Sequence, residues 1–222
     1  MKKWLRENRG FLVFLLCFGV FRTAVADWNP IPSGSMRPTL LEGDVVLVNR
    51  LAYDVKLPLT DIRLLPLAEP ARGDVVTFSS PVDDARLIKR LVGLPGDVIE
   101  MRDGVLVING EVARYEPGQE VQEAVAPGRT LPAWRTVEHL AGRSHPVQAL
   151  PQVMSRRDFG PITVPADHYF MLGDNRDNSA DSRYIGPVPR ERLIGRAHHL
   201  LISADISGNW RPRLERIARR IE

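Results

Sequence analysis

Apolar and polar residues alternate over much of the chain after residue 27, in a pattern typical of β-strands. Two runs, GDVVLVNRLAY (43–53) and GDVVTFSS (73–80), each begin with Gly-Asp, a turn signal, and continue with β-branched residues. Residues 86–112 continue the pattern, with Pro-Gly, Asp-Gly and Asn-Gly pairs between the apolar stretches, as at the turns of hairpins. Strands joined by such turns predict antiparallel sheets that are wrapped or closed, and therefore a mostly β fold.

Two parts of this body depart from the strand pattern. Residues 112–159 are polar, contain prolines and are weakly periodic, and we interpret them as an insertion or small subdomain on the sheet body. In the tail, Leu214, Ile217 and Ile221 follow helical spacing, with arginines on the other faces. This spacing predicts a short C-terminal helix, either packed on the sheet or lying on a membrane surface.

The N-terminal segment supports two interpretations. Basic residues at positions 2, 3, 6 and 9 precede an apolar stretch, 11–21, and the small residues of AVA stand directly before Asp27, as in a cleavable secretory signal. The alternative is an uncleaved membrane anchor over 11–27, although a helix from 11 to 26 spans only about 24 Å against about 30 Å for the hydrocarbon core. Both interpretations make residues 1–10 a basic cytoplasmic tail and place residues 28–222 on the outer side of the membrane.

Composition limits the partners and cofactors. The chain has 222 residues, 44% of them hydrophobic, which suits one domain with a sizeable core. The net charge of +3 equals that of residues 211–222, so no basic field covers the body and nothing favours a nucleic-acid partner. The single cysteine, Cys17, excludes an intrachain disulfide and a cysteine-based metal site, and no His-Glu-x-x-His metal motif is present.

The segment IPSGSMRPTLLEGD (31–44) contains the candidate nucleophile. Gly34 permits a tight turn between Ser33 and Ser35, and Pro38 biases the residue before it toward an extended backbone. A nucleophilic serine needs a base that takes its proton. None of the five histidines stands in a recognised nucleophile-partner motif, so a lysine is a candidate for that base, in a serine–lysine dyad.

Lys89, in the apolar run LIKRLVGL, is the candidate base. A lysine surrounded by apolar side chains loses its charge more easily, whereas an arginine stays protonated. The lysine pKa has to fall from about 10.4 to roughly 7–8 for the amine to act as a base near neutral pH. The alternative is an exposed strand lysine that alternates with buried leucines.

The polar run GDNRDNSADSRY (173–184) is a third candidate segment. The alternation of Asp177, Ser179 and Asp181 suggests a calcium loop, but the glycine and glutamate that an EF-hand requires are missing. The run is otherwise a long solvated turn, or a support in which Ser179 bonds the lysine and an Asp181–Arg183 pair holds the loop rigid.

These three segments, in this order after an apolar N-terminal segment, resemble the signature boxes of bacterial type I signal peptidases, a family of serine proteases with a Ser-Lys dyad. The resemblance covers about residues 20–110 and 160–200 and does not cover the insertion. It implies coiled antiparallel sheets with an apolar face near the membrane, an N-terminal membrane helix, and chemistry that uses no metal and no nucleotide cofactor.

The resemblance also assigns roles to single residues. Ser35 matches the nucleophile and Lys89 the general base, while Ser33 matches the residue whose hydroxyl forms the oxyanion hole with the backbone N–H of Ser35. Ser179 matches the serine that orients the lysine. The structural residues of the same loop match Asp174, Arg176, Asp181 and Arg183. Apolar neighbours of the dyad are expected to line shallow pockets for small substrate side chains: Ile31, Met36, Leu40 and Ile88.

The implied function is the removal of N-terminal signal peptides from exported preproteins after Ala-x-Ala sites, with the substrate bound as an extended strand. The implied location is the bacterial inner (cytoplasmic) membrane, crossed once, with the N-terminus in the cytoplasm and the catalytic domain on the periplasmic side. Implied partners are preproteins, the lipid bilayer and the secretion translocon. The resemblance favours the uncleaved anchor, and because AVAD looks like a substrate of the same enzyme, self-cleavage after Ala26 is a further hypothesis.

Three other functions are alternatives. An autoproteolytic repressor of the SOS type shares the dyad but needs a soluble DNA-binding domain where this chain has an apolar segment. A maturation peptidase specialised for conjugation or pilus proteins fits the same order of segments. A secreted β-rich binding module would carry its serines by chance, and its properties would survive the substitution Lys89→Met.

Overall fold

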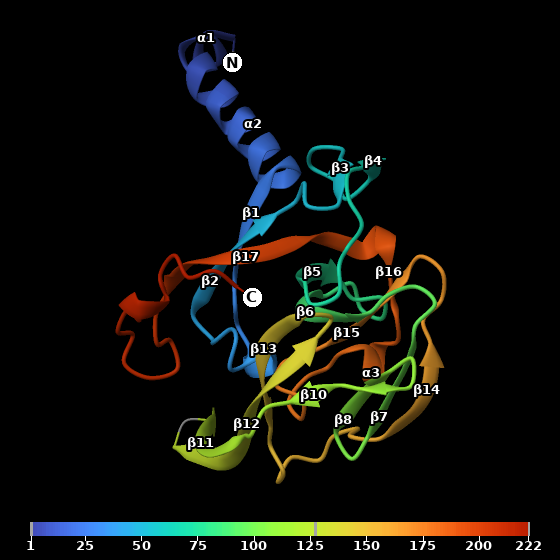
Figure 1. Cartoon of the computed structure of the whole chain (residues 1–222). Helices are drawn as coiled ribbons and strands as arrows, with labels where there is room; N and C mark the ends of the chain where they lie inside the picture. The colour runs from blue at the N-terminus through green and yellow to red at the C-terminus, as the bar shows by residue number, and fades with distance from the viewer. Residues whose placement is uncertain (1, 127, 222) are drawn as a thin grey trace.

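Antiparallel strands make up most of the chain in the computed structural model, which describes residues 2–126 and 128–221 (Figure 1). The mostly β fold predicted from the alternating pattern is confirmed. The largest sheet has the strand order β1-β2-β17-β5-β6-β15-β16. Its strands are β1 (Ala26–Pro30), β2 (Asp44–Asn49), β5 (Val75–Ser79), β6 (Arg86–Gly93), β15 (His168–Leu172), β16 (Val188–Pro189) and β17 (Leu193–Ser203).

Three smaller sheets adjoin the large one. One has the order β14-β7-β8-β9, one has the order β10-β12-β11 with β13 paired to β12, and one is the hairpin β3-β4. Their strands are β3 (Asp54–Lys56), β4 (Arg63–Pro66), β7 (Val98–Arg102), β8 (Val105–Ile108), β9 (Glu111–Val112), β10 (Arg114–Tyr115), β11 (Gln119–Ala126), β12 (Arg129–Leu140), β13 (Arg143–Ala149) and β14 (Phe159–Thr163). The segment predicted as an insertion thus consists mainly of β10 to β13. Its buried positions include the glutamates Glu123 and Glu138, which explains its weak hydrophobic pattern.

The serine segment is anchored in the core by apolar side chains. Residues of β2 alternate between buried and half-buried, as the period of two predicts, and Val46 and Val48 face inward. Ile31, Met36 and Leu40 pack against these two valines in one cluster. Full burial of such a side chain contributes about 1.5–3 kcal/mol, so the cluster ties the serine segment firmly to the large sheet.

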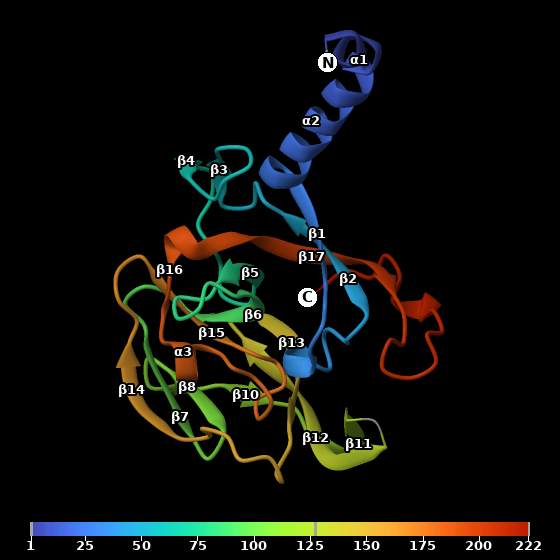
Figure 2. The same ribbon diagram turned by 180° about the vertical axis from the view of Figure 1, so that it is seen from behind.

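The N-terminal residues form α1 (Lys2–Glu7) and α2 (Arg9–Ala24), and α2 projects away from the sheets (Figures 1 and 2). The helix ends earlier than the anchor predicted over 11–27, because residues from Ala26 onward pair with β2, and a single residue separates helix from strand. The Ala26–Asp27 bond, the hypothetical site of self-cleavage, therefore lies inside a paired strand. In the part of the chain that the structure describes, no helix combines the length and apolar character that crossing a membrane requires. The remaining helical segments are short: η1 (Gly34–Met36), α3 (Ser182–Ile185), η2 (Arg190–Arg192) and η3 (Leu214–Arg216).

The β3–β4 hairpin lies beside the end of α2 that joins the sheet (Figures 1 and 2). The backbone N–H of Leu59 donates a hydrogen bond of 3.0 Å to Thr23 Oγ1, which connects the hairpin to the helix. The hairpin exposes the apolar side chains of Leu57, Leu59, Ile62, Leu64, Leu65 and Leu67. The helix exposes those of Phe11, Val13, Phe14, Leu15, Leu16, Phe18 and Phe21. Helix and hairpin together concentrate exposed apolar surface at this end of the molecule, a property of interaction surfaces.

The prediction of a C-terminal helix from the spacing of apolar residues is wrong. The described part of the tail after β17 contains only the short turn η3 and otherwise runs back along β17, where the N–H of Ala218 donates to the carbonyl of Leu200 at 2.8 Å. Arg216, which the spacing assigned to a polar face, is instead buried against Asp44, with Nη2 at 2.6 Å from Oδ2. A buried ion pair, backbone hydrogen bonds to β17 and the packing of Ile221 on the core, rather than an apolar helix face, hold the tail.

We expect Arg216→Met to lower the free energy of unfolding by about 3 kcal/mol, because the Asp44 carboxylate, which has no exposed surface, loses its ionic partner. The matched control is Arg219→Met, an exposed position on the same segment, for which a change below about 0.5 kcal/mol is expected. Equilibrium unfolding in urea measures both variants. Equal changes would contradict a role for the buried pair in holding the tail.

Candidate active site

Ser35 and Lys89 meet in the structure. The turn η1 carries Ser35, and β6 carries Lys89. Lys89 Nζ lies 2.7 Å from Ser35 Oγ, which is hydrogen-bond distance, and donates to the carbonyl oxygen of Ile88 at 3.0 Å. Ser35 is 9% exposed and Lys89 is 3% exposed, so the serine keeps a path to the surface while the amine is shielded from water.

Burial lowers the pKa of Lys89 from its ordinary value of 10.5 to about 8, and the carboxylates of Asp181 and Asp174 oppose only part of that shift. The amine is therefore neutral in a sizeable fraction of molecules near pH 8 and can accept the proton of Ser35. The alternative of an exposed strand lysine is wrong, because the side chain lies in the interior.

Lys56 shows that a low pKa alone does not identify a base. It is also buried, and burial lowers its pKa to about 8. Its amine donates to the carbonyl oxygens of Leu193 and Ile194, the latter at 3.1 Å, and so fastens the β3–β4 hairpin to β17. What distinguishes Lys89 from Lys56 is its contact with a serine hydroxyl.

Asn175 holds the serine turn by two hydrogen bonds. Its backbone N–H donates to the carbonyl oxygen of Ser35 at 3.1 Å, and its Nδ2 donates to the carbonyl oxygen of Gly34 at 2.9 Å. Gly173 allows this close approach, since a Cβ there would lie 2.2 Å from Ser179 Oγ and 2.5 Å from the carbonyl oxygen of Ser35. Any larger residue at position 173 would push the loop away from Ser35.

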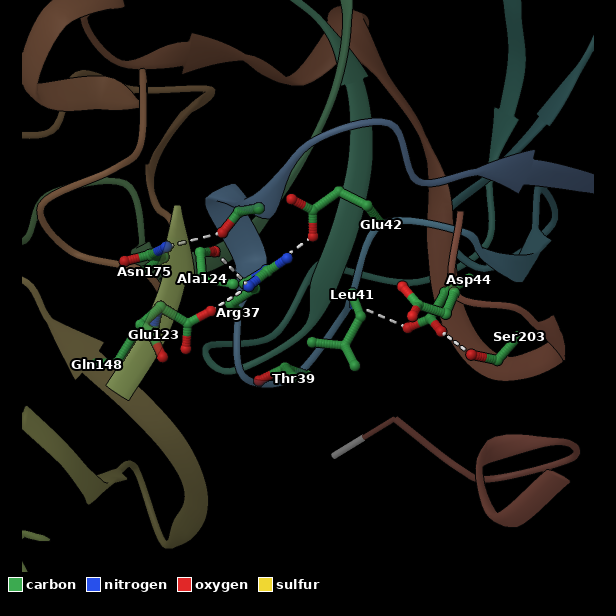
Figure 3. Close-up of polar contacts among 12 residues, drawn as sticks. Arg37, Thr39, Leu41, Glu42, Asp44, Glu123, Ala124, Gln148, Asn175 and Ser203 are labelled. Atoms are coloured by element: carbon green, nitrogen blue, oxygen red, sulfur yellow. Dashed lines mark hydrogen bonds and ion pairs between the residues drawn. The ribbon is translucent and has the colours of Figure 1, made fainter. Parts of the chain in front are cut away.

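Arg37 covers the same turn with a charged side chain (Figure 3). Its Nε donates to Glu42 Oε2 at 2.7 Å, and its Nη1 donates to the carbonyl oxygen of Ala124 at 3.0 Å and pairs with Glu123. Gly34 leaves room for these groups, since a Cβ there would lie 3.0 Å from Glu42 Oε1 and 3.1 Å from Arg37 Nε. The serine turn is thus connected to β11 by a side chain of its own segment.

Buried ion pairs support the loop of residues 173–184. Asp181 and Arg183, predicted as a pair, are joined by two contacts of 2.8 Å, and neither side chain is exposed. Asp174 accepts hydrogen bonds from Nε and Nη2 of Arg90 at 2.9 and 2.8 Å. In a buried pair, loss of one partner leaves an uncompensated charge and costs about 3–5 kcal/mol, whereas a pair on the surface contributes little to stability.

Arg176 connects the loop to the segment predicted as an insertion. It donates to both carboxylate oxygens of Glu138 on β12 at 2.8 and 2.6 Å, and Glu138 has no exposed surface. Sequence reasoning missed Glu138 because a charged residue in a polar, weakly periodic stretch gives no signal of burial. It also missed Arg90 and Asn175, although each adjoins a residue that has an assigned role, and that adjacency is the signal that could have found them.

Ser33 and Ser179 lie in the segments that form the site, and their assigned roles stay predictions. The backbone of Ser33 is extended, at φ −136° and ψ 154°, and its side chain is exposed. The Ser179 hydroxyl is buried beside Gly173 and has no hydrogen-bond partner among the described residues, so the expected bond to Lys89 is not formed.

Met36 and Leu40, expected to line a substrate pocket, have no exposed surface in the structure, and their role at a pocket stays a prediction. Ile31 is 2% exposed, and its role at a pocket likewise stays a prediction. All three are needed as anchors of the serine segment in the core. Ile88 is half-buried against the same cluster and is still a candidate for substrate contact.

His145 is the buried imidazole nearest to this network. Its Nε2 lies 3.2 Å from Glu138 Oε1 and 4.0 Å from Asp174 Oδ1, and burial lowers its pKa. Nowhere in the described ranges do three or more His, Cys, Asp or Glu side chains form a group that could hold a metal ion.

Several known proteins are similar to this chain. The family described as "Signal peptidase, peptidase S26" matches residues 2–202. Signal peptidase I of Pseudomonas aeruginosa is 38% identical over 212 residues, covering 88% of this chain and 72% of the relative. Signal peptidase I of Rickettsia typhi is 34% identical over 221 residues, covering 92% of this chain and 83% of the relative. A crystal structure of a signal peptidase I from Enterococcus faecalis aligns with a TM-score of 0.35 and 30% identity, over 59% of this chain and 97% of that one.

We expect Lys89→Met to raise the free energy of unfolding at pH 7 by about 1–3 kcal/mol. A pKa lowered from 10.5 to about 8 corresponds to a penalty of about 3 kcal/mol for the charged amine, from which the lost hydrogen bonds subtract. The penalty is complete below pH 8 and declines as the pH rises from about 8 to 10.5, because the unfolded lysine keeps its ordinary pKa.

Urea unfolding of wild type and variant at pH 7 and pH 10 tests this expectation. The stability difference between the two proteins should shrink at the higher pH. A difference that is independent of pH, or a less stable variant at pH 7, would contradict the unfavourable burial of a charged lysine.

Proposed function

Because the chain belongs to the peptidase S26 family of signal peptidases, we propose that it removes N-terminal signal peptides from exported preproteins by means of a dyad of Ser35 and Lys89. Membership of the family makes it a serine endopeptidase. One observation carries the assignment of the dyad: the Nζ of a buried lysine with a lowered pKa lies 2.7 Å from Ser35 Oγ. A serine with a lysine as its base is a known replacement for the catalytic triad.

In the proposed reaction, neutral Lys89 takes the Ser35 proton as Oγ attacks the carbonyl carbon of the scissile bond. The negative charge that forms on the carbonyl oxygen is bound by the backbone N–H of Ser35 and the hydroxyl of Ser33; one such donor contributes about 2.7–4 kcal/mol to lowering the barrier. The protonated amine then gives its proton to the leaving nitrogen, which leaves an ester between the substrate and Oγ. Neutral Lys89 next takes a proton from a water molecule as the water oxygen attacks the ester carbon. The bond between that carbon and Oγ then breaks, the protonated amine returns its proton to Oγ, and the acid is released.

Two free strand edges beside the dyad support binding of an extended substrate. The pairing of β6 with β15 begins at Arg90, so the first half of β6 has an edge without a partner among the described strands, as does the outer edge of β1. Arg86 Nη1 contacts Asp27 Oδ2 at 3.0 Å between these edges, and Lys89 contacts Ser35 further along. A peptide added between β1 and β6 by backbone pairing would bring its scissile carbonyl to the serine.

Packing under the dyad supports a preference for small residues before the cut. Met36 and Leu40 fill the interior below the serine turn and leave no exposed surface there. A large substrate side chain pointing inward would have to displace them, and overpacking a close-packed core is unfavourable. We therefore keep the Ala-x-Ala site as the proposed substrate motif, with Ile88 as one wall.

The exposed apolar surface of α2 and the β3–β4 hairpin supports attachment to a lipid bilayer. On this proposal α2 is the membrane anchor, with Arg22 near its sheet-proximal end at the level of the head groups. Residues 28–222 then form an extracytoplasmic catalytic domain at the bacterial inner membrane, where preproteins leave the translocon. The apolar hairpin would lie against the same leaflet as the end of α2.

We expect Ser35→Ala and Lys89→Met to lower cleavage of a preprotein with an Ala-x-Ala site by at least about a thousandfold, since each removes a member of a unit that acts together. The assay uses the detergent-solubilised full chain. Lys56→Met is the matched control, because that lysine is also buried with a pKa near 8 but contacts only carbonyl oxygens. Undiminished cleavage by Lys89→Met would exclude the dyad, and a folded wild type that cleaves no such preprotein would exclude the proposed substrate class.

The rate constant kcat/KM should rise with pH through a midpoint near 8, because only the neutral form of Lys89 accepts the serine proton. Below the midpoint the rate should fall about tenfold per pH unit as the protonated amine accumulates. Initial rates between pH 6 and pH 9.5 measure the profile. Lys56→Met should keep the same midpoint; a midpoint that moves in this control, or a flat profile in wild type, would contradict Lys89 as the base.

A further inference from the structure

The turn that carries Ser35 has little structure of its own. It consists of three residues, and its backbone hydrogen bond runs from the N–H of Arg37 to the carbonyl oxygen of Gly34 at 3.1 Å. A single 3-10 turn is weak, whereas a nucleophile has to be held within about 0.5 Å of its productive position. Contacts from outside the turn must therefore fix it.

Arg37, which directly follows the turn, makes such contacts with residues of β11 (Figure 3). Its Nη1 donates to the carbonyl oxygen of Ala124 at 3.0 Å and forms an ion pair with Glu123, while Nε donates to Glu42 at 2.7 Å. The Arg37 side chain is 15% exposed. Because its Nε lies within 3.1 Å of the position of a Cβ on Gly34, the guanidinium packs directly on the residue that precedes the nucleophile.

Glu123 is a fixed point in its own sheet. The residue is 3% exposed and stands opposite Leu131 in the pairing of β11 with β12, which pairs in turn with β13. Its carboxylate also pairs with Arg135 of β12. Backbone pairing holds Glu123 in the sheet whether or not Arg135 is present, whereas Arg37 reaches Glu123 from a different part of the chain.

From these contacts we infer that Arg37 is a positioning residue for Ser35, and that the β11–β12–β13 sheet serves catalysis by providing its anchor, Glu123. The inference rests on the proposed function, because the group that is positioned is the nucleophile of that reaction. Arg37 acts through the backbone of the turn, and its charge is balanced by Glu42 and Glu123. The pair between Arg176 and Glu138 attaches the second catalytic segment to the same sheet.

The first test compares the cleavage kinetics of Arg37→Met, Glu123→Gln and Arg135→Met. Arg135 is the matched control, since it pairs with the same carboxylate but belongs to the sheet itself. The first two variants should lower kcat about tenfold with little change in KM, because a displaced nucleophile impairs the chemical step. Their pH midpoint should stay at the wild-type value, as Lys89 is untouched. Arg135→Met should keep kcat within about twofold of wild type.

A double variant, Arg37→Met with Glu123→Gln, sharpens the comparison. If Arg37 and Glu123 act through one contact, the kcat of the double variant should equal that of Arg37→Met rather than fall by a second factor of ten. The thermal unfolding midpoint of every variant is recorded, and Glu123→Gln, which keeps the size of the side chain, provides the test if Arg37→Met does not fold. Equal kcat in Arg37→Met, Glu123→Gln and Arg135→Met would overturn the inference.

Hydrogen exchange of the backbone amides of residues 34–37, 39 and 40 tests the same inference without any substrate. Exchange should be faster in Arg37→Met and Glu123→Gln than in wild type or Arg135→Met, because the turn opens more often. Exchange that is the same in all four proteins would overturn the inference even if wild type cleaves preproteins. If wild type cleaves none, the proposed function fails, and the exchange rates still decide whether Arg37 fixes the turn.

Discussion

The burial of one lysine amine beside one serine hydroxyl is the constraint on which the rest of the structure depends. A lysine in water is a cation, and only removal of water makes its neutral form accessible near physiological pH. The fold achieves this by placing Lys89 on β6, between β5 and the serine turn, at 3% exposure. The same exclusion of water strengthens every electrostatic interaction at the site, including those that would stabilise an oxyanion.

Much of the fold and the contact between the two residues of the proposed dyad could be predicted from sequence because the relevant signals are local. Alternation with a period of two and Gly-containing turns specify strands, and Val46 and Val48 lie inside as their positions predict. Ser35 and Lys89 were recognisable from short segments that resemble a known family. The full burial of Met36 and Leu40 was not recognisable, since an apolar residue near the serine suits a pocket wall and a core anchor equally well.

The failures of prediction share a physical cause, which is the burial of charge. Arg216 has helical spacing from its neighbours but turns inward to Asp44, and Glu123 and Glu138 occupy core-like positions in a polar stretch. Sequence patterns assume that charged residues face water. The chain has 26 arginines and four lysines. The buried carboxylates named here pair with arginine, whose charge is permanent. The buried lysines Lys56 and Lys89, in contrast, both have pKa values near 8.

The passage from α2 to β1 through a single residue has a mechanical consequence. A helix that continues almost directly into a strand of the large sheet cannot swing on a flexible tether, and the hydrogen bond between Leu59 and Thr23 braces the joint from the side. On the proposed topology, the nucleophile then stands at a constant height above the bilayer. The protein would then select the bond that it cuts by the distance of that bond from the lipid as well as by the substrate side chains beside it.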